Sequence, residues 1–261
     1  MKIETDRLKA TSIKVYADGA LGSRGARLLK PYSDDSLNRG YVITSKDSIK
    51  KWAVACKQAS FQLCVHCIGT EANRATLDAM GEVLGGTNDR RWRIEHAQVV
   101  HPDDREKFGR YNILPSMQPT HATSDMYWVE SRLGRNRMQW AYSLQSLKNQ
   151  NGLIPLGTDF PVESIDPLNT FYAATVRKDP NQYPENGFIM EEGLTREEAL
   201  KGMTIWAAIA SFDDHLKGSI EAGKYADFVI LDRDLLTCEE DNILSTKVLE
   251  TWIHGERVYK K

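Results

Sequence analysis

Three short apolar runs in this sequence each end in a side chain that can bind a metal ion. The first run ends at His66, the second at His96 and the third at Asp159. In a parallel α/β barrel the carboxyl ends of the strands meet at one mouth, so ligands placed at strand ends converge there. The order His, His, Asp therefore predicts a metal-dependent hydrolase. No His-x-His pair occurs anywhere in the 261 residues.

Strands and helices are expected to alternate through most of the chain. Apolar residues recur with helical spacing over residues 45–59 and 71–84, and Ser45 or Asp47 can cap the first of these helices. Strands are expected at residues 10–17, 61–67, 92–95, 112–117 and 153–156. This alternation is typical of βαβ units that form a parallel sheet.

The pattern changes after Thr195, which opens a capping box with Glu198. From Gly218 onward the sequence favours short antiparallel strands. We therefore expect two domains, a partial hydrolase barrel over residues 1–217 and a small β appendage over residues 218–261.

The strand count predicts an α/β fold that is an incomplete TIM-type barrel containing the later strands only. About five barrel-type strands precede the appendage, whereas a closed barrel of this class needs about eight. We expect the missing strands to be those at the N-terminus. A parallel sheet with a bare edge favours association, so the partners expected are a further copy of the chain or a missing N-terminal segment.

Composition and charge exclude several other classes of protein. The net charge of −2 offers no field that would attract nucleic acid. No run approaches the ~18 apolar residues of a membrane-spanning helix, and the N-terminus has no apolar segment typical of a signal peptide. Four cysteines are too few for a disulfide framework, so a cytoplasmic location is expected. Cys64 and Cys67 are interpreted as buried strand residues, because no second Cys/His pair completes a zinc site.

Six motifs in order resemble the C-terminal half of an amidohydrolase-superfamily protein of the YtcJ-like subgroup. They begin at Ile13, Val65, Arg93, Ser116, Gly157 and Gly218, and read IKVYADGALGSRGA, VHCIG, RIEHAQ, SMQPTHA, GTDFPV and GSIEAGKYADFVIL. The resemblance implies a distorted TIM barrel with a small β-sandwich. It also implies a centre of one or two divalent metal ions, with Zn²⁺ expected, and hydrolysis of an amide-type C–N bond in a small molecule.

The same resemblance implies roles for individual residues. His66 and His96 resemble the histidine ligands of the fifth and sixth strands, and Asp159 resembles the aspartate of the eighth, which binds metal and acts as the catalytic base. Lys14 resembles the bridging lysine that such enzymes often carboxylate. Gln118 and His121 lie in the motif where the seventh strand approaches the substrate.

Each assignment has a structural alternative. His66 could be a hydrogen-bonded core histidine, Asp159 could cap a turn, and Lys14 could be a surface lysine at a strand end. His121 could support a metal ligand rather than contact the substrate. The aromatic-rich residues 124–137 could form a lid over the site or pack against the barrel.

Two departures from the family pattern bear on activity. Thr70 stands where relatives carry an aspartate, so a carboxylate that would hydrogen-bond near His66 is expected to be absent. Without the His-x-His pair, the chain retains Lys14, His66 and His96 as one set of three ligands but cannot complete a second. The alternative is a catalytically inactive remnant, or one half of a split assembly. A sugar- or nucleotide-binding module is disfavoured because no Gly-rich phosphate loop follows any strand.

Overall fold

The computed structural model describes residues 2–5 and 8–261, which form two compact units. The first unit comprises Met1–Met117 and Asp125–Ile154, and the second comprises Gln118–Ser124 and Pro155–Lys261. The second unit thus includes residues on both sides of position 217. None of the described helices is both long enough and apolar enough to span a bilayer.

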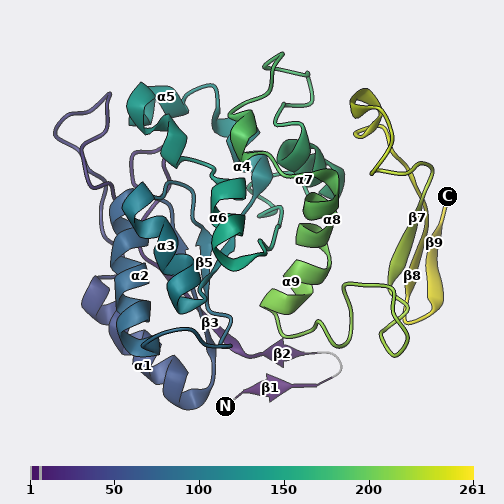
Figure 1. Ribbon diagram of the computed structural model, residues 1–261, viewed down its shortest axis with the longest axis horizontal. Helices are drawn as coiled ribbons and strands as arrows, with labels where there is room; N and C mark the ends of the chain where they lie inside the picture. Colours follow the sequence, from purple (N-terminus) through teal and green to yellow (C-terminus); the bar gives the residue numbers. More distant parts are fainter. Residues whose placement is uncertain (1, 6–7) are drawn as a thin grey trace. The chain divides into compact units, whose positions relative to one another are not determined.

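The first unit is built on a four-stranded parallel sheet in the order β3-β4-β5-β6 (Figure 1). Its strands are β3 (Ser12–Tyr16), β4 (Gln62–Cys67), β5 (Arg93–His96) and β6 (Leu114–Ser116). The helices α1 (Lys46–Ala59), α2 (Thr70–Leu84) and α3 (Pro102–Tyr111) link successive strands. The α/β class and the parallel sheet predicted from the sequence are therefore confirmed. A short antiparallel pair, β1 (Ile3–Glu4) and β2 (Lys9–Ala10), precedes the sheet.

The two faces of this sheet differ in chemistry because successive strand residues point to opposite sides. One face is apolar and buried, and α1 and α2 contact β4; its residues include Val15, Leu63, Val65 and Ile94. The register places polar residues together on the other face; these are Lys14, Tyr16, Cys64, His66, Arg93 and Glu95. The chemistry of this unit is thus concentrated on one side of its sheet.

Cys64 and Cys67 are both buried, as predicted, and face opposite sides of the sheet. The Cys67 thiol donates a hydrogen bond to the Thr76 hydroxyl, with Sγ and Oγ1 3.2 Å apart. Burial raises the pKa of Cys64 to about 11. Because only a thiolate binds metal well, a protonated buried thiol fits a packing role.

The rest of the first unit contains α5 (Val129–Leu133), η1 (Arg135–Trp140) and α6 (Leu144–Asn151). Val129 and Leu133 are buried, and the Trp128 ring lies against Gly22. For this part of residues 124–137 the contacts favour packing over a free lid.

The second unit combines helices with a three-stranded antiparallel sheet in the order β7-β8-β9. Its elements are α4 (Pro119–Asp125, whose last residue belongs to the first unit), α7 (Pro167–Thr175), η2 (Met190–Glu192), α8 (Arg196–Met203), α9 (Ile205–Ala210), β7 (Phe228–Leu231), η3 (Glu240–Asn242), β8 (Val248–Ile253) and β9 (Glu256–Lys260).

The strand predicted at residues 153–156 is wrong, because only Leu156 is in a β-bridge there. Pro155 has no N–H to donate to a ladder, which disfavours a strand here, although Pro115 is accommodated in β6 at the edge of its sheet. The segment instead runs irregularly, and the Leu156 N–H donates to the carbonyl of Gly202 at 3.0 Å.

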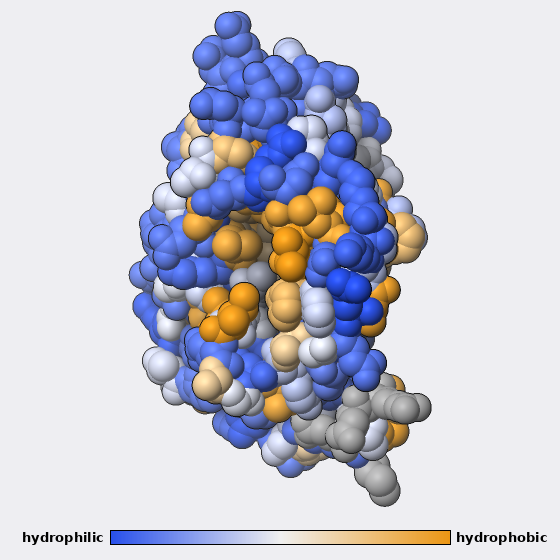
Figure 2. All heavy atoms as spheres, turned by 90° about the vertical axis from the view of Figure 1, so that its right-hand side faces the viewer, coloured by the Kyte–Doolittle hydropathy of each residue, from blue (hydrophilic) through white to orange (hydrophobic). Residues whose placement is uncertain are grey.

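The β7-β8-β9 sheet is only partly covered. Figure 2 views the molecule from the side of this sheet, where apolar residues appear at the surface beside hydrophilic ones. Its exposed apolar side chains are Val229, Ile230, Ile253, Val258 and Tyr259. A sheet that leaves so many apolar residues in contact with solvent is typical of a surface that other strands can cover.

The capping box predicted at Thr195 is present at the start of α8. The Thr195 hydroxyl accepts the Glu198 N–H at 3.2 Å, and the Glu198 carboxylate accepts the Thr195 N–H at 3.0 Å. Thr195→Ala is expected to lower the free energy of unfolding by about 1 kcal/mol, because the Glu198 N–H loses the hydroxyl that caps it. Urea denaturation measures this, and Thr195→Ser should remain close to the unmodified protein. Equal stability of the alanine and serine variants would contradict the prediction.

Candidate metal centre

His66 and His96 lie side by side at the carboxyl ends of β4 and β5. Their ring centroids are 4.7 Å apart, with the ring planes at 71°. The Tyr16 ring, from the end of β3, lies 5.0 Å from His66 on its other side. Parallel pairing brings these three strand ends to one edge of the sheet. The convergence of the two histidines expected from the sequence is therefore observed.

The backbone at His96 accounts for the direction of its ring. Cys67 pairs with His96, so a regular strand would place His96 on the face opposite to His66. Instead, His96 has a φ of 75° and Ala97 a φ of 42°, both in the left-handed region. Such conformations are unfavourable for residues with a side chain and are concentrated at functional sites. We infer that this local turn directs the imidazole toward His66.

The His66 ring has the properties of a metal ligand. Its Nε2 atom is buried and makes no hydrogen bond to any described residue; the Asp18 Oδ1 atom lies 3.7 Å away. Burial, assisted by electrostatic repulsion from the neighbouring His96 and Lys14, lowers the pKa of His66 to about 3. The neutral imidazole is the form that binds divalent metals. A buried ring nitrogen without a partner is costly, and a metal ion at this position would satisfy it.

Asp18 is the central structural residue of this site, and sequence reasoning missed it. Its buried carboxylate accepts backbone N–H groups from Ile68 at 2.9 Å, Gly69 at 2.8 Å and Arg27 at 2.8 Å. Burial raises the pKa of Asp18 to about 7, and these three N–H groups oppose the shift. Asp18 thereby holds the loop that follows His66 against the loop that follows β3. The only sequence signal was the Asp18-Gly19 pair, which is typical of a turn.

Thr70 and Asp18 both fix the loop that follows His66, where relatives carry an aspartate at position 70. The buried Thr70 hydroxyl accepts the Leu29 N–H at 2.9 Å, so this residue also fixes the loop after β4. A carboxylate does lie close to His66, but Asp18 supplies it from the end of β3. At 3.7 Å this carboxylate is too far from His66 Nε2 for a hydrogen bond, so the expected loss of a hydrogen-bonding carboxylate at His66 stays a prediction.

A second carboxylate on the polar face is Glu95, in register with His66. Burial raises the pKa of Glu95, but Arg93 and a hydrogen bond with Ser116 outweigh this effect, so the pKa lies below its usual value. The Arg93 Nε and Glu95 Oε1 atoms are 2.9 Å apart. This ion pair was also missed from the sequence, although the two residues are neighbours on one strand face.

Lys14 lies on the same polar face, one strand-face position before Tyr16. It is exposed, and its Nζ atom lies 5.2 Å from the centroid of the Tyr16 ring. Its charge contributes to the lowered pKa of His66. Its role as a carboxylated bridging ligand stays a prediction.

The second unit brings His121 and Asp159 together. The His121 Nε2 and Asp159 Oδ2 atoms are 3.5 Å apart. Asp159 has a φ of 60°, again in the left-handed region. The adjoining contact from Ser124 Oγ to Glu163 Oε1 is 2.6 Å and holds α4 against the loop that carries Asp159. The backbone carbonyl of Gln118 accepts the His121 N–H at 3.1 Å, which places Gln118 at the start of this segment.

Gly69 is required by the close approach of two loops. A Cβ atom at this position would lie 2.1 Å from the carbonyl oxygen of Arg27. Gly69→Ala is expected to lower the free energy of unfolding by about 1–3 kcal/mol, because backbone must move to accommodate the methyl group. Gly86→Ala is the matched control, because no atom lies within 4 Å of its added Cβ. Equal midpoints for the two variants in urea would contradict the role assigned to Gly69.

Comparison with known proteins identifies one family. The model of the amidohydrolase family matches residues 2–259. Among curated proteins, the chain is 36% identical to Protein LONG AFTER FAR-RED 3 of Arabidopsis thaliana, over 95% of this chain and 42% of the relative. It is 31% identical to the putative amidohydrolase YtcJ of Bacillus subtilis (strain 168), over 96% of this chain and 47% of the relative. The chain thus spans about half the length of these relatives.

Two further similarities concern function and fold. The chain is 26% identical to N-substituted formamide deformylase of Arthrobacter pascens, over 100% of this chain and 48% of that enzyme. The crystal structure of an uncharacterized metal-dependent hydrolase from Pyrococcus furiosus superposes with a TM-score of 0.80 at 33% identity. That match covers 90% of this chain and 47% of the hydrolase.

Proposed function

The chain belongs to the amidohydrolase family, and we propose that it forms part of a metal-dependent hydrolase that cleaves an amide-type C–N bond in a small molecule. The observation that carries this proposal is the neutral His66 imidazole beside His96, because its buried Nε2 atom lacks a hydrogen bond among the described residues. The similarity to a metal-dependent hydrolase and to a formamide deformylase supports the same chemistry.

His66 and His96 are the proposed protein ligands in the first unit, with Zn²⁺ as the expected ion. Imidazole nitrogens suit Zn²⁺, and a catalytic site uses about three protein ligands and leaves one position open. Lys14, if carboxylated, and Asp159 are the further ligands that the family resemblance implies. The 261 residues contain no His-x-His pair, so a binuclear centre would need ligands supplied from outside this sequence.

Asp159 is the proposed catalytic base. When bound, a divalent metal supplies Lewis acidity and makes water easier to deprotonate. The Asp159 carboxylate, about one-third exposed, accepts the proton and later passes it to the leaving amine. The His121 ring 3.5 Å away orients this carboxylate. Gln118 and His121 are the proposed substrate contacts.

The architecture proposed is the later part of a TIM-type barrel, over residues 1–217, followed by part of a β-sandwich over residues 218–261. Two observations support it. The sheet of the first unit has a polar face that carries His66, and the His96 ring centroid lies 4.7 Å from that of His66 at the strand ends, as at the mouth of such a barrel. The β7-β8-β9 sheet exposes apolar residues that further strands would cover. We also propose that the bare edge of β3 pairs with a further copy of the chain or with an N-terminal segment. The proposed location is cytoplasmic.

Metal analysis of the purified chain, with and without an added N-terminal segment, tests the proposed function. We expect stoichiometric divalent metal together with hydrolysis of members of a panel of N-formyl and N-acyl amines. Absence of bound metal in both states would overturn the proposal. Bound metal without hydrolysis in either state would instead favour the catalytically inactive alternative.

A further inference from the structure

A pocket of about 400 Å³ lies in the first unit, and neither His66 nor His96 lines it. It is formed by residues 30–33 and by residues 133–137, which include the end of α5 and the start of η1. Its lining contains three cationic side chains, those of Lys30, Arg135 and Arg137, and contains neither aspartate nor glutamate.

Arg137 joins the two walls of the pocket. Its guanidinium donates to the carbonyls of Leu133 and Lys30 and to the Ser33 hydroxyl, the last at 3.0 Å. Burial lowers the pKa of Arg137, and none of these three acceptors carries a charge. A partly buried cation that is solvated only by neutral groups leaves a positive potential unless an anion compensates it.

The carboxylate of Asp34, the first acidic residue after Ser33, is engaged by two other guanidinium groups. Asp34 accepts hydrogen bonds from the guanidinium groups of Arg24 and Arg132. Arg132 in turn donates to the carbonyl of Gly22 at 3.0 Å, and its own carbonyl accepts the Ser33 N–H at 2.9 Å. These contacts hold the walls of the pocket in place and leave Lys30 and Arg135 exposed at its mouth.

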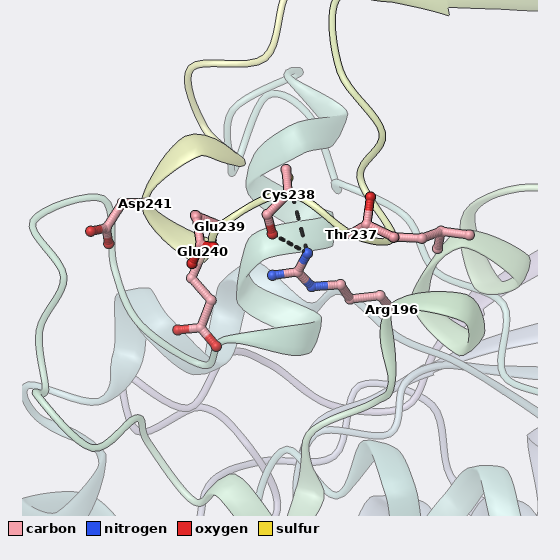
Figure 3. A pocket seen from close by; sticks show the side chains of 7 residues that line it. Arg196, Thr237, Cys238, Glu239, Glu240 and Asp241 are labelled. Carbon is pink, nitrogen blue, oxygen red and sulfur yellow. Dashed lines mark hydrogen bonds between the residues drawn. The ribbon is translucent and has the colours of Figure 1, made fainter.

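The pocket of the second unit shows the opposite arrangement. It has a volume of about 510 Å³ and one cation, Arg196. Figure 3 shows this guanidinium donating to Cys238, with Glu239, Glu240 and Asp241 lining one side of the same pocket. The lining of this pocket thus holds three acidic residues and one cation, whereas the pocket at residues 30–33 and 133–137 is lined by three cations and no acidic residue.

We propose that the pocket formed by residues 30–33 and 133–137 binds a small organic anion that carries a phosphate or carboxylate group. Arg135 and Lys30 contact the anionic group, and Arg137 holds the two walls at the right separation. Guanidinium and ammonium groups are the usual protein partners of both anions. The site is independent of the proposed metal centre.

Isothermal titration calorimetry of the full chain with inorganic phosphate, and separately with succinate, tests the proposal. We expect one saturable site for at least one probe, and the two arms distinguish phosphate from carboxylate recognition. Lys30→Gln and Arg135→Gln are each expected to weaken binding about fivefold to tenfold through loss of a charge-assisted hydrogen bond. Added salt should weaken binding further.

Matched variants separate this site from other cationic surfaces and from the metal centre. Lys51→Gln removes one exposed positive charge elsewhere in the first unit and should leave binding unchanged. His66→Asn should also leave it unchanged. No saturable binding of either probe would overturn the proposal. Binding that is lost in His66→Asn but retained in Lys30→Gln and Arg135→Gln would also overturn it, while leaving the proposed function intact.

Discussion

Asp18→Ala is expected to lower the free energy of unfolding by about 3 kcal/mol or more. The substitution leaves the N–H groups of Arg27, Ile68 and Gly69 buried without their acceptor. Each unsatisfied buried donor costs about 1–3 kcal/mol. Urea denaturation monitored by circular dichroism measures the change.

Asp18→Asn provides the graded comparison if the alanine variant does not fold. The amide keeps one acceptor oxygen and replaces the other with a donor, so an intermediate loss of stability is expected. Asp89→Ala is the surface control, because the Asp89 side chain is 74% exposed and its contact with Arg91 is worth about 0–1 kcal/mol. An Asp18→Ala variant no less stable than the Asp89→Ala variant would disprove the anchoring role of Asp18.

His66→Asn and His96→Asn are each expected to weaken binding of Zn²⁺ or Co²⁺ by about 100-fold or more. Loss of a group that merely supports a metal ligand costs about 10–100-fold in affinity, and loss of a ligand should cost at least as much. The hydrolytic activity should fall with the metal content. Competition titration with a chromophoric chelator measures the affinity, and the visible spectrum of the cobalt form reports on the ligand set.

His215→Asn is the matched control for these variants. His215 is exposed and lies in the second unit, on the segment after α9. This variant should retain the metal affinity and the cobalt spectrum of the unmodified protein. Unchanged metal affinity in His66→Asn, with the fold intact by circular dichroism, would refute the ligand assignment.

Much of the fold follows from local patterns in the sequence. Helical spacing and the caps at Ser45 and Thr195 predicted α1 and α8, whose starts lie one residue beyond each cap. Apolar runs predicted β4, β5 and β6 to within a few residues. The failure at residues 153–156 is only partly local: Pro155 removes a ladder donor, but β6 accommodates Pro115 at a sheet edge.

Several features of the site depend on residues far apart in the chain. The carboxylate of Asp18 meets the N–H of Gly69 across 51 positions, and the guanidinium of Arg137 meets the Ser33 hydroxyl across 104 positions. Apolar periodicity and capping motifs depend only on residues a few positions apart. They therefore could not predict hydrogen bonds between residues so distant in the sequence. The left-handed conformation at His96 could not be predicted from the sequence either. Local propensity disfavours it, so the surrounding structure must impose it.

The sequence by itself determined the family, the parallel α/β class and the identity of the histidines at the strand ends. Those properties follow from short motifs and from the periodicity of apolar residues, both of which can be read from the sequence without knowledge of the fold. Only the tertiary structure decided that His66 is buried and neutral beside His96, that Asp18 holds the adjoining loop, and that three cations share a pocket without a carboxylate. Burial and charge compensation are properties of the folded chain, because they depend on which distant residues exclude water from a given side chain.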